Sequence, residues 1–254
     1  MGTTKLTRKE ILAEDPVHGS IITLVDFFRS NRKMLSIVLS VAIVLALGVY
    51  GGFLFLEKKQ AQAQEILGRG MDFFHAQVET DAPEDPFENG PVAVFDTDEK
   101  KYQAAAKEFE IIVKDYGYTK VAPIARYYLG LSELKMDKTN DAVENLKMVS
   151  GDNEKSTIGC LAGQVLARIY EKQGNYEEAR KILEPMIDND SYELPKEELR
   201  MQLAGILADE GRDDEALNIL QEGVSEVSSV SPLRDRLTAE MEKMQKKIKL
   251  ESNP

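Results

Sequence analysis

Residues 166–186 read LARIYEKQGNYEEARKILEPM, and this stretch decides the fold of the chain. Apolar residues recur within it every three or four positions, both before and after Gly174, which is the spacing of one face of an α-helix. A glycine at the end of such a run marks the end of a helix. Ala167 and Ala179 are small enough to let two antiparallel helices approach closely. The stretch therefore predicts a helix–turn–helix unit.

The same unit returns along the chain at a step of 37 residues. Gly174 and Gly211 keep this step, with Asp137 in the equivalent position. Four further columns keep it: Ala105, Ala142, Ala179 and Ala216; Phe109, Leu146, Leu183 and Leu220; Leu129, Leu166 and Leu203; and Gly130, Ala167 and Ala204. Agreement of so many columns at one offset predicts a series of stacked helix pairs, which is an all-α solenoid.

The unit at 166–186 resembles the tetratricopeptide repeat. The residues that carry the resemblance are Leu166, Ala167 and Tyr170 on the first helix, Gly174, Asn175 and Tyr176 at the turn, and Ala179 and Leu183 on the second helix. Residues 203–220 repeat the pattern, whereas residues 129–146 carry Glu133 where an apolar residue is usual. Because a tetratricopeptide repeat has about 34 residues, the longer step predicts longer turns between repeats.

The repeat that ends at Phe109 has no first helix directly before it. Residues 81–99 stand in that place, and their prolines and acidic side chains predict a loop. We infer that residues 57–80 supply the missing helix, so that the repeat domain spans residues 57–230 with an acidic insertion. The acidic run at 96–99 is either a solvated loop or a divalent-cation site, although it lacks the glycine and the spacing of a calcium loop.

Residues 34–56 form a run without charge, MLSIVLSVAIVLALGVYGGFLFL. As a helix this run measures about 35 Å, enough to cross roughly 30 Å of hydrocarbon. A signal peptide has a shorter apolar core nearer the N-terminus, so the run predicts a retained membrane anchor, with a buried core helix as the alternative. Gly48 and Gly52 have the GxxxG spacing that allows close packing with another membrane helix, a spacing that also arises by chance.

Charge differs between the two sides of this run. The chain has 32 Lys and Arg against 44 Asp and Glu, a net charge of −12. Residues 1–33 carry a net charge of +2, and residues 57–254 carry −14. The basic N-terminal segment favours a cytosolic N-terminus, with the repeat domain on the other side of the membrane. The strongly acidic domain repels phosphate, which disfavours binding of nucleic acid.

Residues 231–254 follow the last repeat. Ser231 and Pro232 form the N-cap and first-turn pattern of a final helix. Its apolar positions lie on one stripe, namely Leu233, Leu237, Met241, Met244 and Ile248. A solenoid needs a terminal helix with a polar outer face, so we expect this segment to cap the repeats. A coiled-coil site for a partner is the alternative.

In tetratricopeptide solenoids the first helix of each repeat lines the concave surface. That register implies a groove lined by Ile124, Tyr127, Leu131 and Leu134, then by Leu161, Gln164, Arg168 and Glu171, and then by Glu198, Met201, Gly205 and Ala208. Such a groove suits an amphipathic or extended segment of another protein. The alternative is that helices of this chain fill it. The register lacks the basic and asparagine pattern of grooves that clamp a C-terminal carboxylate.

Catalytic and metal-binding constellations are not evident in the sequence. The two histidines, His18 and His75, lie on opposite sides of the expected anchor, so they cannot act together. The single Cys160 sits among apolar residues, where a buried thiol is expected, and it excludes an intrachain disulfide. We therefore expect no enzymatic activity, no cofactor, no metal and no small-molecule substrate.

The arrangement of a short N-terminal segment, one anchor and an acidic repeat domain, with DFFRSNRKML leading into the anchor, resembles the bacterial family of ancillary Sec-translocon subunits. This resemblance implies a single-pass inner-membrane protein with a cytoplasmic N-terminus and a periplasmic repeat domain. It also implies a role beside the protein-conducting channel, in handing exported proteins to periplasmic chaperones. A structural scaffold in a cell-envelope assembly is the alternative function.

Overall fold

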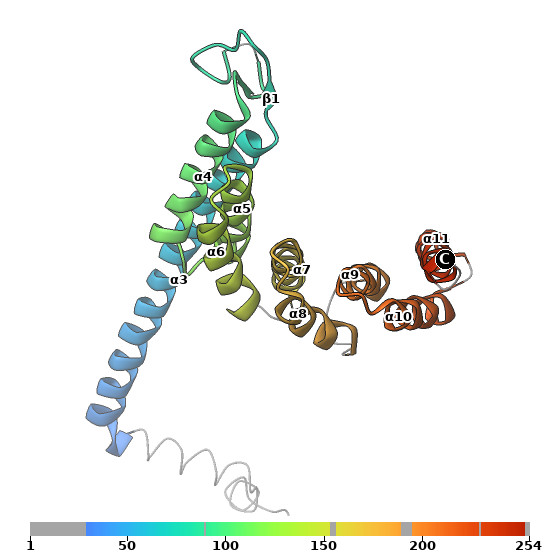
Figure 1. The fold of residues 1–254 in the computed structure, drawn as a ribbon. Helices are drawn as coiled ribbons and strands as arrows, with labels where there is room; N and C mark the ends of the chain where they lie inside the picture. The colour runs from blue at the N-terminus through green and yellow to red at the C-terminus, as the bar shows by residue number, and fades with distance from the viewer. Residues whose placement is uncertain (1–28, 89, 153–155, 189–194, 229, 252–254) are drawn as a thin grey trace, which may run out of the picture. The chain divides into compact units, whose positions relative to one another are not determined.

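The computed structural model describes residues 29–88, 90–152, 156–188, 195–228 and 230–251. The chain divides into two compact units, Met1–Lys58 and Lys59–Pro254. In the first unit, the apolar run lies within helix α3, Arg32–Phe74 (Figure 1). The side chains of residues 36–56 are exposed. By its length and composition, α3 is able to cross a membrane.

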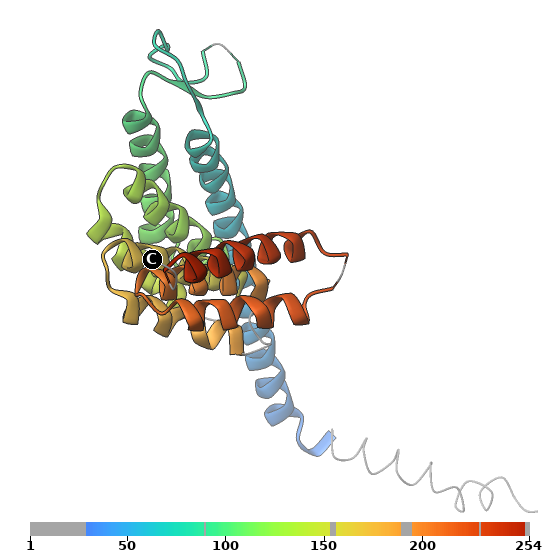
Figure 2. The same cartoon turned by 45° about the vertical axis from the view of Figure 1, so that its right-hand side comes forward.

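The second unit is a solenoid of helices that pack in chain order (Figures 1 and 2). Its helices after α3 are α4 Asp98–Asp115, α5 Ala122–Lys135, α6 Thr139–Asp152, α7 Thr157–Lys172, α8 Tyr176–Asp188, α9 Lys196–Asp209, α10 Asp213–Glu226 and α11 Pro232–Glu251. Each helix from α5 to α10 makes its largest set of contacts with the helices directly before and after it in the chain. The predicted helical solenoid is confirmed.

The residues that repeat every 37 positions form the interior of this solenoid. Tyr170 is partly buried and packs against the core. The other repeating residues are buried: Ala105, Phe109, Leu129, Gly130, Ala142, Leu146, Leu166, Ala167, Ala179, Leu183, Leu203, Ala204, Ala216 and Leu220. Gly130 shows why a small residue is needed there, because a Cβ at this position would lie 2.9 Å from Cγ of Leu146 on the next helix.

The turn inside each helix pair has one geometry in three repeats. Asp137, Gly174 and Gly211 all adopt positive φ, at 60°, 73° and 80°. The residue after each of them donates a backbone hydrogen bond five positions back, and these bonds are Lys138 N to Glu133 O, Asn175 N to Tyr170 O, and Arg212 N to Leu207 O. This is the Schellman ending of an α-helix, which requires a left-handed residue. The turn conformation therefore recurs every 37 residues, as the sequence pattern does.

The second half of α3 supplies the first helix of the first repeat. Ala63 and Gly70 of α3 are buried, and Ala63 belongs to one core cluster with Ala105 and Phe109 of α4. A Cβ at Gly70 would lie 2.5 Å from Cε1 of Phe109, so the two helices touch at this point. One uninterrupted helix thus contains both the apolar run and a helix of the repeat domain.

The segment between α3 and α4 is more ordered than the expected loop. Helix α3 ends at Phe74, six residues before the end of the segment 57–80 from which the sequence predicts this helix. Strand β1, Gln77–Val78, then pairs in parallel with strand β2, Val94–Phe95. Phe95 is buried, and its ring meets that of Phe73 edge-on at 5.5 Å. The described residues between 81 and 97 are loop apart from β2, and apolar residues within this acidic segment pack back onto the end of α3.

Helix α11 closes the other end of the solenoid. The hydroxyl of Ser231 accepts a hydrogen bond from Leu233 N at 3.3 Å, as an N-cap does. Leu237 is fully buried in the cluster formed by α8, α9 and α10, and Met241 and Met244 pack against the same cluster. The apolar stripe of residues 231–254 therefore faces the solenoid, as expected of a capping helix.

Candidate protein-binding groove

Two neighbouring hollows lie along the first helices of the repeats. The first, here called the α5–α7 hollow, has a volume of about 550 Å³. Its lining comes mainly from Leu131, Leu134, Lys135, Val165, Arg168, Ile169 and Lys172, with Asp137, Thr139 and Gln173 at the turn ends. The apolar side chains on both helices form one side of the lining, and three basic side chains outnumber the single carboxylate. In a domain of net charge −14, this hollow is locally positive.

The second hollow lies between α7 and α9, here called the α7–α9 hollow, and has a volume of about 280 Å³. It is lined by Gln164, Arg168, Glu171, Glu198, Met201, Gln202, Gly205 and Arg236. Arg168 lines both hollows, so they adjoin at this side chain. Arg236 comes from α11 and forms an ion pair with Glu198 of α9. The cap helix thus contributes to the groove as well as to the core.

Hydrogen bonds and burial shape the α7–α9 hollow. Gln202 Nε2 donates to the backbone oxygen of Gln164 at 3.1 Å, which ties α9 to α7, while Gln202 Oε1 is buried without a hydrogen-bond partner among the described residues. Burial raises the pKa of Glu171, and the nearby charge of Asp209 raises it further. The floor of the groove therefore holds a buried acceptor and a carboxylate that is partly removed from water.

The structure brings together part of the residue set that the repeat register predicts. Leu131, Leu134 and Arg168 line the α5–α7 hollow. The α7–α9 hollow is lined by the predicted residues Gln164, Arg168, Glu171, Glu198, Met201 and Gly205. The remaining four predicted residues, Ile124, Tyr127, Leu161 and Ala208, line neither hollow and are partly buried.

Two of the predicted residues pack against the chain itself. Tyr127 packs against the core between α6 and α7, and its ring meets that of Tyr128 edge-on at 5.4 Å. Burial raises the pKa of the Tyr127 phenol, and Tyr128 adds to that effect. Ala208 packs against the core of the last two repeats. These two side chains therefore contribute to packing within the chain and not to either hollow.

Some groove residues were missed by the sequence analysis. Val165 and Gln202 each lie one position after a predicted residue, so a wider register would have included them. Lys135 and Lys172 occupy equivalent positions at the ends of α5 and α7, 37 residues apart, and this recurrence was visible in the sequence. Arg236 could not be found this way, because it belongs to the cap and not to a repeat.

The other candidate chemical sites have structural roles. Thr97 caps α4 by accepting a hydrogen bond from Lys100 N, and Asp96 forms an ion pair with Lys100 at 2.6 Å. Among the described residues, no three His, Cys, Asp or Glu side chains gather as metal ligands would. His75 stacks edge-on against Phe74 at 5.2 Å, and Cys160 is buried. His18 lies outside the described residues.

Comparison with known proteins places the fold in a family. The family described as "Tetratricopeptide repeat-like domain" matches residues 26–200. A search among curated proteins found no match. Among solved structures, nearly identical TPR-like repeats from Podosopora anserina share 17% identity with a TM-score of 0.49, covering 75% of this chain and 85% of that one, and a variant of the same repeats gives the same values. Since the family match covers more than half of the 254 residues, the protein belongs to the tetratricopeptide repeat-like domain family.

Proposed function

We propose that this protein is a membrane-anchored interaction module whose groove along α5, α7 and α9 binds a segment of another protein. Repeats of this class typically serve as protein-interaction scaffolds. The observation that supports the proposal most strongly is the pair of adjoining hollows, which share Arg168 and continue along three successive first helices. A continuous groove of this kind suits an extended or helical segment better than a compact small molecule.

The lining of the groove indicates the chemistry of that segment. The α5–α7 hollow offers Leu131, Leu134 and Val165 to an apolar side chain, while Arg168 and Lys172 stand beside them to pair with a carboxylate. In the α7–α9 hollow, Met201 offers a flexible apolar contact and Gln202 Oε1 is an acceptor for a donor on the segment. The segment that fits is therefore apolar, with acidic side chains at the end that lies in the α5–α7 hollow.

The proposed setting is the bacterial inner membrane, with the N-terminus in the cytoplasm and the repeats in the periplasm. The charge asymmetry, +2 before the apolar run and −14 after it, supports this orientation. In that setting the protein acts as an ancillary subunit near the Sec translocon and assists the handover of exported proteins to chaperones. The anchor raises the effective concentration of the groove near the channel.

Copurification in mild detergent tests this function. The full-length protein should retain a translocon component or a periplasmic chaperone, and Leu131→Lys combined with Met201→Lys should weaken that retention. The matched control carries lysine at two exposed positions outside the groove, Asp115 and Glu144. Recovery of the same partners from all three proteins would contradict binding in the groove.

A structural scaffold of an envelope assembly is the second candidate, and one feature of α3 favours it. A Cβ at Gly48 or Gly52 would meet nothing within 4 Å in this chain, so the GxxxG face is open to another membrane helix. Gly48→Ile with Gly52→Ile should then release partners that bind through the anchor. Tyr50→Ile is the control, because position 50 lies on the opposite side of the helix from Gly48 and Gly52.

A further inference from the structure

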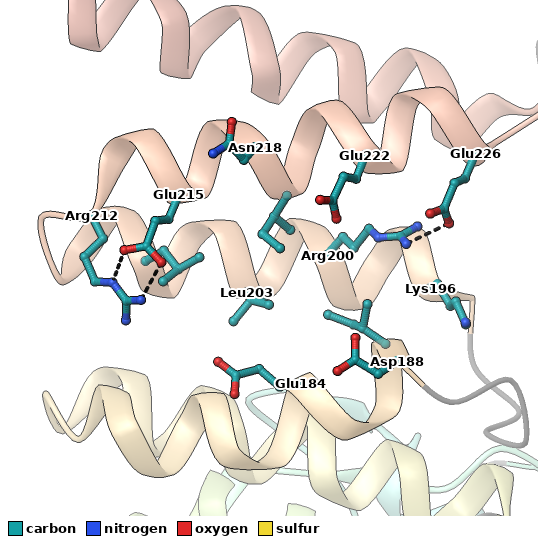
Figure 3. A pocket seen from close by; sticks show the side chains of 13 residues that line it. Glu184, Asp188, Lys196, Arg200, Leu203, Arg212, Glu215, Asn218, Glu222 and Glu226 are labelled. Carbon is teal, nitrogen blue, oxygen red and sulfur yellow. Dashed lines mark hydrogen bonds and ion pairs between the residues drawn. The ribbon is translucent and has the colours of Figure 1, made fainter.

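A cleft of about 570 Å³ lies on the opposite side of α9 from the groove, between α8 and α10 (Figure 3). At 3.6 residues per turn, Arg200, Leu203 and Leu207 face away from Met201 and Gly205. Its apolar floor comes from α9, with Ile187 of α8 and Ile219 of α10 beside it. The repeat pattern accounts for Leu203 as a core residue but assigns no role to the polar side chains of this face.

The walls of the cleft are predominantly acidic. Five carboxylates line it, Glu184, Asp188, Glu215, Glu222 and Glu226, against the three cations Lys196, Arg200 and Arg212 (Figure 3). Arg212 is already paired with Glu215 at 2.6 Å and with Glu210 at 3.0 Å. Asp188 and Glu222, on facing walls, have no ion-pair partner among the described residues. The uncompensated charge facing the cleft is therefore negative.

The burial of Arg200 is a second, independent observation at this cleft. It is only 6% exposed, and its Nη2 pairs with Glu226 Oε2 at 2.7 Å. Its Nε is buried and has no acceptor among the described residues. Burying a donor without an acceptor costs free energy, and an occupant that places a carbonyl oxygen beside Arg200 removes that cost.

We propose that the cleft between α8 and α10 is a second binding site, which takes a basic amphipathic segment of a partner protein. Lysine or arginine side chains of the segment pair with Asp188 and Glu222, and its apolar side chains pack on Leu203, Leu207 and Ile219. Backbone carbonyls of the segment face Arg200. An anionic segment is disfavoured because it would meet five carboxylates. This site does not depend on the groove along α5, α7 and α9.

The test uses full-length protein in a nonionic detergent and a helical peptide of leucine and lysine that carries a benzophenone on its apolar face. After irradiation, mass spectrometry should find the peptide attached mainly to α8, α9 and α10. Asp188→Asn with Glu222→Gln, two changes at exposed positions, should reduce this attachment about tenfold. A peptide with glutamate in place of lysine should not label the cleft.

The matched control is Asp115→Asn with Glu144→Gln, which removes the same two charges from exposed positions outside the cleft. This variant should be labelled at the cleft as strongly as the unchanged protein. Equal loss in both variants, labelling spread over all acidic surfaces, or cleft labelling by the glutamate peptide would each overturn the proposal.

Discussion

Gly70 and Gly68 lie two positions apart on α3 and have different surroundings. A Cβ at Gly70 would lie 2.5 Å from the fully buried ring of Phe109, whereas a Cβ at Gly68 would meet nothing within 4 Å. We expect Gly70→Ala to lower stability by about 1–2 kcal/mol, because overpacking exceeds the gain in helix propensity. Gly68→Ala should raise stability by about 0.5–1 kcal/mol. Thermal unfolding followed by circular dichroism compares them, and equal midpoints would contradict the contact between α3 and α4.

Glu133 stands where the repeat usually has an apolar residue, and it is 8% exposed. Both of its oxygens accept from Asn145 Nδ2, at 3.1 and 3.0 Å. Burial raises the pKa of Glu133 above its usual range, and the bond from Asn145 opposes that shift only in part. The folded protein therefore binds a proton at Glu133 before the unfolded chain does as the pH falls.

The resulting pH dependence has a definite sign. Below the unfolded pKa of about 4.3, Glu133 is protonated in both states and its contribution to the free energy of unfolding is fully present. As the pH rises through the higher folded pKa, Glu133 ionises where burial disfavours its charge, and that contribution is lost. Glu133→Gln, which stays neutral, should thus be more stable than the unchanged protein at pH 7, with the difference shrinking toward pH 4. Melting temperatures between pH 4 and 8 measure it, with the exposed Glu144→Gln as the control. A difference that does not vary with pH would show that Glu133 titrates normally.

At the scale of elements, α11 belongs to the folded core of the repeat domain. Leu237 is fully buried, and its Cδ atoms lie close to Gly223 on α10, whereas Leu250 on the same helix is 65% exposed. Leu237→Ala should lower the free energy of unfolding by about 2–5 kcal/mol, and Leu250→Ala by less than about 0.5 kcal/mol. Chemical denaturation measures both. Equal effects would mean that α11 does not pack as a cap. Because Leu237 belongs to the core, removal of residues 231–254 should lower the stability of the repeat domain as well as any binding through this helix.

The helices were predictable because several residues of each repeat carry the same information. The repeated positions of Ala179 and Leu183 predict the buried face of the helix, and the position of Gly174 predicts the turn. Each signal is weak alone, but they agree in successive repeats. Strands β1 and β2 have two residues each, which is too short for a period of two to show. Their pairing depends on Phe73 meeting Phe95 across the acidic segment, a contact between residues distant in the sequence.

The candidate sites were less predictable than the fold, for a related reason. The repeat register identified Leu131, Arg168 and Met201 as groove residues, because each lies on the first helix of a repeat. It could not show that Tyr127 would turn into the core, since that depends on Tyr128 and on the packing of α6 and α7. The cleft around Arg200 was missed entirely, because an arginine on an otherwise ordinary helix has no sequence signature of burial.

The whole protein contains one long apolar helical run and a repeat domain with two chemically different faces. The groove is locally basic and apolar at the α5–α7 hollow, and the cleft between α8 and α10 is acidic. Protease treatment of intact and osmotically opened cells should leave residues 57–254 protected in the first case and digested in the second. Protection in opened cells would place the repeats in the cytoplasm and contradict the proposed setting.

If the groove binds another protein in the cell, site-specific photo-crosslinking from groove positions should capture that protein. A photoreactive amino acid is placed at Leu131 or Met201 in the groove, or at Asp115 or Glu144 on exposed surfaces of α4 and α6 outside it. We expect discrete crosslinked protein adducts from both groove positions and none from the two outside positions. Absence of adducts from the groove, or the same adducts from all four positions, would contradict binding in the groove.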